Sequence, residues 1–199
     1  MTRRRDNLPA IVLFVALAAM ARPAAGQTDH VSDSERKALF LSNFLQFVHW
    51  PAGAFQDSTD SLRVQIIGRD PFDGSLDRVL ADKTLDHRRV VVTHTAVPSI
   101  TPFPHVAVIS ATEVPRLASL LASYCRAPVL TVSDLDRFAN RGGMIGLVEG
   151  GVAGLIEDDH GVHFVINRMA ANEAHLQVDA EILHLAYPLF SAVSPCGAR

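Results

Sequence analysis

The sequence is poor in cysteine and lysine and has no excess of positive charge. Its 199 residues include two cysteines and two lysines, and they carry a formal net charge of -3. Two cysteines are too few for a small disulfide scaffold, and an acidic chain is not typical of a protein that binds duplex nucleic acid. Hydrophobic residues make up 48% of the chain and charged residues 20%. These proportions predict one globular domain rather than a disordered or fibrous protein.

Signatures of the common enzyme classes are also missing. The sequence contains no GxGxxG, P-loop, GxSxG or HExxH motif. His160 and His163 stand three residues apart and could hold a metal ion together with Asp158 and Asp159. Zinc ligands with this spacing normally sit on a helix with further ligands, so a solvated polar loop is the preferred interpretation. We therefore predict no catalytic residue, no metal and no cofactor.

The first 26 residues have the three parts of a secretory signal peptide. Arginines at positions 3–5 precede an uncharged stretch from Leu8 to Ala21, and small residues follow at positions 24–26. The uncharged stretch is shorter than the roughly 20 residues that a membrane-spanning helix needs. We predict cleavage after Gly26, with Ala25 as the alternative site, and no membrane insertion of the mature chain, residues 27–199.

Export would place Cys125 and Cys196 where disulfides can form and persist. A bridge between them would attach the C-terminal tail to the body of the domain. Free thiols and a bridge between two copies of the chain are the alternatives. A catalytic thiol is not expected, because no motif flanks Cys125 and CxxC is absent.

Hydrophobic patterns predict strands that alternate with helices. Ser32 and Glu35 form a capping box that starts a helix at about residue 33, and Pro51 ends it near residue 49. Further helices are expected at 75–81, 113–124, 134–140, 168–175 and 180–185, and strands at 62–67, 90–95, 105–110, 128–132, 144–148 and 162–166. The last two strands are expected to pair antiparallel. This alternation predicts a single α/β domain with a mostly parallel central sheet and helices on both faces, a three-layer, Rossmann-like arrangement.

Several polar and glycine residues have structural interpretations. Gly142 and Gly143 are expected to supply positive φ in a tight turn, and Asp134 to cap the helix that follows it. Asn43 is expected to be a buried amide and Asn167 a helix cap. The glycine-rich, acidic segment 149–161 is expected to be a mobile loop.

A set of local strings resembles the YfiR/HmsC-like family of exported bacterial proteins. The opening helix carries ERKALFLSNF at 35–44 and ends in FVHWP at 47–51. Further strings agree in order along the mature chain: IGRDPF at 67–72, VLTVSD at 129–134, GGMI at 142–145, HFVIN at 163–167 and ILHLA at 182–186. Two features depart from the family. The paired cysteines seen in some members do not correspond to Cys125 and Cys196, and the connection from Val148 to His163 is longer than usual.

The resemblance implies a periplasmic α/β protein that is not an enzyme. The best understood members of the family bind the periplasmic sensor domain of an inner-membrane diguanylate cyclase and hold that cyclase inactive. Loss of this repression raises cyclic di-GMP and promotes biofilm formation. Family members are commonly dimeric, and the sequence offers apolar residues near its C-terminus for a homodimer, at Ile182, Leu183, Leu185 and Ala186.

The partner or ligand surface is expected where the first helix ends, at His49 and Trp50, with Gln177 and Asp179 from the turn before the last helix and Arg69 as a second cation. Trp50 has an alternative interpretation as a core residue. The leading functional hypothesis is repression of a diguanylate cyclase. A periplasmic sensor or binding module for a small ligand, feeding another membrane receptor, is the alternative, and a hydrolase is a distant third.

Overall fold

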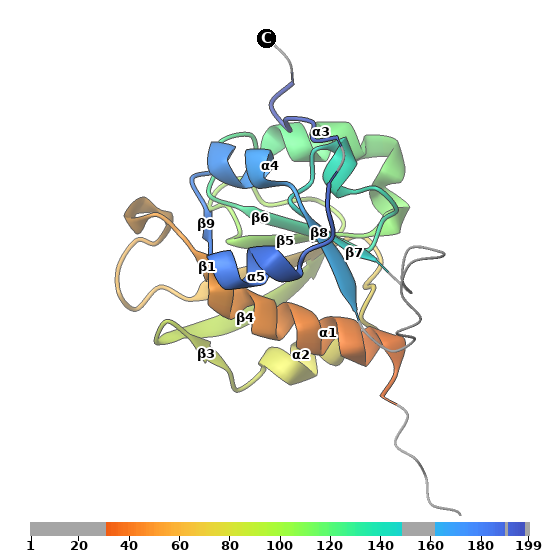
Figure 1. Ribbon diagram of the computed structural model, residues 1–199. Coiled ribbons are helices and arrows are strands. Elements are labelled where there is room, and N and C mark those ends of the chain that lie inside the picture. The colour runs from red at the N-terminus through yellow and green to blue at the C-terminus, as the bar shows by residue number, and fades with distance from the viewer. Residues whose placement is uncertain (1–30, 149–161, 190, 198–199) are drawn as a thin grey trace, which may run out of the picture. The chain divides into compact units, whose positions relative to one another are not determined.

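Strands and helices alternate along most of the chain in the computed structural model, which describes residues 31–148, 162–189 and 191–197 (Figure 1). The helices are α1 (Asp33–Phe44), α2 (Ser75–Leu80), α3 (Leu117–Ser123), α4 (Arg168–Glu173) and α5 (Ala180–Leu185), and the 3-10 turns are η1 (Leu45–Phe47), η2 (Ala52–Ala54), η3 (Ala111–Arg116) and η4 (Ala139–Arg141). The strands are β1 (Val48–His49), β2 (Leu62–Ile67), β3 (Thr84–Leu85), β4 (Arg88–Thr95), β5 (Val106–Ile109), β6 (Leu130–Ser133), β7 (Ile145–Val148), β8 (His163–Ile166) and β9 (Gln177–Val178).

The central sheet has seven strands in the order β3-β4-β2-β5-β6-β7-β8. Its five middle strands, from β4 to β7, are parallel, whereas β8 pairs antiparallel with β7 and β3 antiparallel with β4. The predicted α/β class, the mostly parallel sheet and the antiparallel final pair are therefore confirmed. A separate two-stranded ladder joins β1 to β9.

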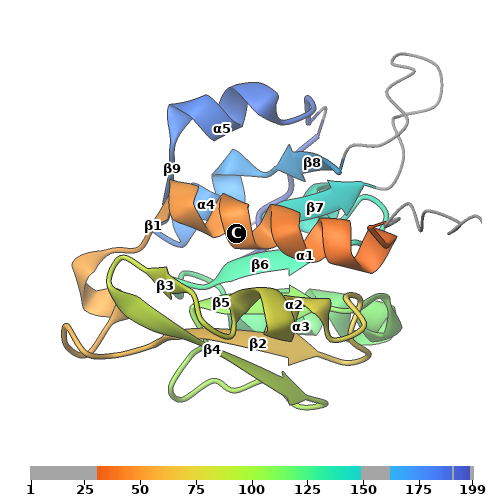
Figure 2. The same ribbon diagram turned by 90° about the horizontal axis from the view of Figure 1, so that it is seen from below.

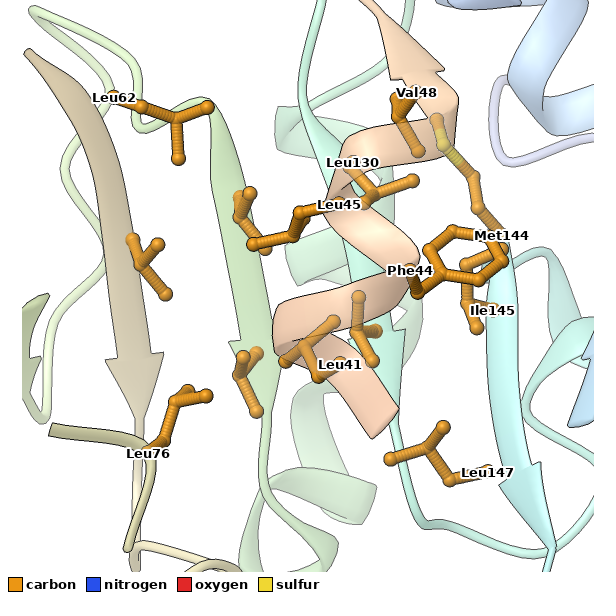
Figure 3. Packing of buried hydrophobic residues seen from close by; sticks show 14 of the residues in the cluster. Leu41, Phe44, Leu45, Val48, Leu62, Leu76, Leu130, Met144, Ile145 and Leu147 are labelled. Atoms are coloured by element: carbon orange, nitrogen blue, oxygen red, sulfur yellow. The ribbon is translucent and has the colours of Figure 1, made fainter. Parts of the chain in front are cut away.

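One face of the sheet is covered by α1 and α2, which lie side by side (Figure 2). Ser32 caps α1 as expected, because its hydroxyl accepts the backbone N–H of Glu35 at 3.1 Å. Leu41, Phe44 and Leu45 point from this helix and its 3-10 extension toward the sheet (Figure 3), and each is fully buried. Burying a side chain of this size stabilises a fold by about 1.5–3 kcal/mol, so α1 is held mainly by its apolar face.

The other face of the sheet packs against α3. Leu117, Leu120 and Leu121 from this helix form a second buried cluster with Ile67 and Ile109. A disulfide joins Cys125, just after α3, to Cys196 in the C-terminal tail, 71 residues later. The tail is thereby tied to this side of the molecule.

Several local expectations are wrong. The first helix ends at Phe44 and not near residue 49, because Val48 and His49 leave it to pair with β9. Asn43 is exposed, and the buried polar residue next to it is Ser42. Residues 134–140 form no α-helix, and Asp134 pairs with Lys37 at 3.3 Å instead of capping one.

The glycine turn is partly as expected. Gly142 has φ +101°, as expected. Gly143 has no positive φ, but a Cβ atom at this position would clash with the Phe138 ring. Asn167 caps α4 as predicted, since its side chain accepts the N–H of Ala170. The signal peptide and the segment 149–161, with His160, Asp158 and Asp159, lie outside the described residues.

Candidate functional site

The short β1–β9 ladder brings together residues from the two ends of the chain. His49 lies opposite Gln177, and Val48 lies opposite Val178. The backbone N–H of Asp179 also donates to the carbonyl of Phe47 at 3.0 Å. Backbone hydrogen bonds thus fix the relative position of segments about 130 residues apart in sequence.

His49 and Asp179 form an ion pair across this ladder whenever the imidazole is protonated. Nε2 of His49 lies 2.9 Å from Oδ1 of Asp179, and the two side chains are 48% and 44% exposed. The exposed side chain of Gln177 lies beside them. Three residues expected at the partner surface are therefore adjacent, polar and accessible to another molecule.

Trp50 is half-buried and lies directly after His49. Its Nε1 donates to the backbone carbonyl of His105 at 3.2 Å, and its ring meets those of Phe55 and His105 edge-on, each at 6.4 Å between centroids. The indole is thus anchored toward the sheet and still borders the exposed pair. We call His49, Trp50, Gln177 and Asp179 the junction surface.

A cavity of about 370 Å³ adjoins the inner side of Trp50. Its walls combine apolar side chains with a cation, a carboxylate, a hydroxyl and an amide: Leu45, Gln46, Trp50, Leu62, Lys83, Thr84, Leu85 and Asp86. Lys83 donates to Ser42 at 2.6 Å, which holds its ammonium group against α1. This mixture of groups suits a small polar molecule better than a purely apolar one.

His105 contacts Trp50 of the junction surface from the buried side, and the sequence did not predict this contact. Only 2% of this residue is exposed. Its Nδ1 accepts the backbone N–H of Arg63 at 2.9 Å, and its Nε2 is 3.0 Å from the carbonyl of Ala54. Burial lowers the pKa of His105 from the usual 6.5 to about 4. A single histidine ahead of an apolar strand carries no sequence signal of such a role.

Arg69 does not lie with the other expected residues. It lies two residues after the end of β2, where its backbone N–H donates to Thr112. Trp50 instead borders His105, which contacts Arg63, the second residue of the same strand. A six-residue strand is about 20 Å long, so Arg69 lies at the opposite end of β2 from Arg63 and Trp50.

Asp70, Asp77 and His94 are the one group in the described part of the chain whose possible metal-ligand atoms lie within 4.8 Å of one another. Nε2 of His94 is 3.0 Å from Oδ1 of Asp77, and the Asp70 carboxylate accepts the N–H groups of Phe72 and Gly74. These contacts join α2 to β4 and fix the turn after β2. Hydrogen bonds that stabilise the fold therefore account for the proximity of these three residues.

A family model described as YfiR/HmsC-like matches residues 34–187. The chain belongs to the YfiR/HmsC-like family. The match runs from α1 to the second residue after α5 and includes the whole junction surface, and it confirms the resemblance seen in the sequence. No match was found among curated proteins.

Membership of the YfiR/HmsC-like family places the chain among exported periplasmic proteins with regulatory rather than catalytic roles. Across residues 31–148, 162–189 and 191–197, no helix combines the length and the apolar character needed to cross a membrane.

Proposed function

We propose that this protein represses an inner-membrane diguanylate cyclase by binding the cyclase's periplasmic sensor domain through the junction surface. The bound cyclase would make less cyclic di-GMP, and biofilm formation would fall. Family membership supports the regulatory role. The observation that carries the choice of surface is the exposed His49–Asp179 pair, held on a backbone ladder next to a tryptophan.

The junction surface combines features that suit a protein interface. Trp50 offers a large amphipathic ring whose orientation is fixed by its bond to His105. His49, Gln177 and Asp179 supply donors and acceptors around it, and the ladder limits the entropy that these side chains lose on binding. Tryptophan within a polar rim is a common arrangement of interface hot spots.

The proposal includes export of the chain. Residues 1–26 act as the signal peptide, cleavage follows Gly26, and residues 27–199 form the periplasmic protein. No cofactor is needed for repression by contact.

The alternative function is a small-ligand sensor that feeds another membrane receptor. The cavity beside Trp50, with Lys83 and Asp86 in its walls, is the observation that favours it. A ligand there would lie next to the junction surface and would change partner binding through Trp50.

Replacing His49 with alanine should reduce capture of the cyclase without unfolding the protein. The change removes the ion pair to Asp179, and both side chains are about half exposed, so the free energy of unfolding should change by less than about 1 kcal/mol. Tagged wild-type and variant proteins are used to purify partners from membranes, and the partners are identified by mass spectrometry. His94→Ala, which removes a similarly exposed pair between His94 and Asp77, serves as the control.

Equal recovery of the cyclase by the wild-type and His49→Ala proteins would show that the binding surface lies elsewhere. An unfolded His49→Ala variant would show that the junction surface belongs to the hydrophobic core. Absence of any diguanylate cyclase in the wild-type sample would favour the sensor alternative.

We also propose that the protein forms a homodimer through the C-terminal region. Of the four apolar residues that the sequence offers for a dimer, Ile182 is buried in the core of the monomer. Leu183 and Ala186 are half-buried, and Leu185 is 72% exposed. Light scattering at several concentrations should give a dimer mass, and Leu185→Glu should lower it toward the monomer, whereas Val97→Glu, at a similarly exposed apolar residue outside this region, should not. A monomer mass at every concentration would contradict the dimer.

A further inference from the structure

His105 holds one short segment of the chain in place by three different contacts. Its Nε2 binds the carbonyl of Ala54, its ring stacks on Phe55 at 4.2 Å between centroids, and its own carbonyl accepts the Trp50 indole. These contacts reach the first residue and the last two residues of the segment 50–55, which connects β1 to the loop before β2. The position of Trp50 in the junction surface therefore depends on His105.

One contact of His105, the bond from the Arg63 N–H to Nδ1, requires the neutral imidazole, whereas the Nε2–H bond to Ala54 does not. Nδ1 accepts the backbone N–H of Arg63, so a proton on Nδ1 would place two donors against each other at 2.9 Å. The tautomer with its proton on Nε2 satisfies both nitrogens, because Nε2–H then donates to Ala54. Protonation of the ring removes the bond to β2 and leaves a buried charge.

Charged groups around His105 increase this cost. The Arg63 guanidinium has Nη2 at 3.4 Å from Nε2 of His105, and the Arg88 guanidinium lies 3.9 Å from the centre of the Phe55 ring that stacks on the imidazole. Asp60 is the opposing carboxylate, and it is already paired with Arg63 at 2.7 Å. A protonated imidazole would therefore lie near two guanidinium groups, and the one nearby carboxylate already pairs with Arg63.

We propose that protonation of His105 releases residues 50–55 from β2 and β5, so that the junction surface changes its conformation as the surroundings become acidic. The link from this release to partner binding rests on the proposed function. The release itself does not, because it depends only on the burial of the charged ring and on the lost bond to Arg63.

The direction of the effect follows from linkage. In the closed segment the neutral ring is favoured, and the pKa of His105 is about 4, against 6.5 for an unperturbed histidine. The stabilisation of the closed segment is therefore complete above pH 6.5 and is lost as the pH falls toward 4. Over that range the ratio of open to closed segment should rise by roughly 80-fold.

Trp50 is the chain's single tryptophan and reports directly on this segment. In the purified protein, its emission should shift to longer wavelength and its quenching by acrylamide should increase between pH 6.5 and 4, while far-UV circular dichroism stays constant. His105→Asn, which keeps an acceptor but cannot titrate, should give a Trp50 signal that does not change over this range. His49→Ala should keep the pH response, because it removes only the exposed neighbouring histidine.

A Trp50 signal that stays flat, that titrates equally in His105→Asn, or that changes only when the far-UV signal is lost would overturn the proposal. If His105→Asn does not fold, nuclear magnetic resonance titration of the His105 ring in the wild-type protein decides. The proposal requires the ring and Trp50 to titrate together below pH 6.5, and separate titrations would refute it. Because no cyclase is present in these measurements, their failure leaves the proposed repression untouched, and a failed capture of the cyclase leaves the pH response untouched.

Discussion

Replacing Gly143 with alanine should destabilise the protein by about 3 kcal/mol or more. A Cβ atom on Gly143 would lie 2.1, 2.3 and 2.4 Å from three atoms of the Phe138 ring. That ring is 1% exposed and belongs to the buried cluster against α3, so it has no free space to enter. The backbone must move instead, although Gly143 is held by a bond from its N–H to the Phe138 carbonyl.

Urea denaturation measures this effect, and Gly53→Ala is the matched control. A Cβ on Gly53 would have no neighbour within 4 Å, so its substitution should change the free energy of unfolding by less than about 0.5 kcal/mol. If the two variants unfold at the same urea concentration, the close approach of Gly143 to Phe138 is not a feature of the native protein.

Replacing Asn167 with alanine should cost about 3 kcal/mol, because one fully buried side chain makes three hydrogen bonds. Its Oδ1 accepts the N–H of Ala170 and starts α4, while its Nδ2 donates to the carbonyls of Ala139 and Val193. The substitution therefore removes a helix cap and also two links to η4 and to the C-terminal tail.

Two further variants divide this loss into its parts. Asn167→Asp keeps the cap acceptor but places a carboxylate oxygen against the two carbonyls, so it tests the loss of those links together with this repulsion. Asn172→Ala changes an exposed asparagine of the same helix and should have little effect. Thermal or urea unfolding in which Asn167→Ala matches Asn172→Ala would disprove the role assigned to the buried amide.

The parts of the fold that the sequence predicts are those encoded by local patterns. The α1 start follows from the Ser32 cap, and the cap at Asn167 follows from its place between a strand and a helix. Apolar runs locate the buried strands because both faces of a parallel sheet are covered. The β1–β9 ladder was not predicted, because two-residue strands so far apart in sequence leave no periodic pattern.

The residues of the candidate site also fall into those that the sequence predicts and those that it does not. His49, Gln177 and Asp179 were expected near one another from their positions beside element ends, and the structure brings them together. Arg69 was misplaced, because its side of the molecule depends on the direction of β2 in the assembled sheet. His105 was missed, because its burial and its bonds to Arg63 and Ala54 exist only after three separate segments meet.

Repression of a diguanylate cyclase is tested most directly by measuring intracellular cyclic di-GMP after deletion of the gene, in a strain where the cognate cyclase is expressed and functional. The nucleotide level should rise on deletion, return to its original value when the wild-type gene is restored, and stay high when the His49→Ala gene is restored at equal protein abundance. An unchanged level after deletion would contradict the proposed repression.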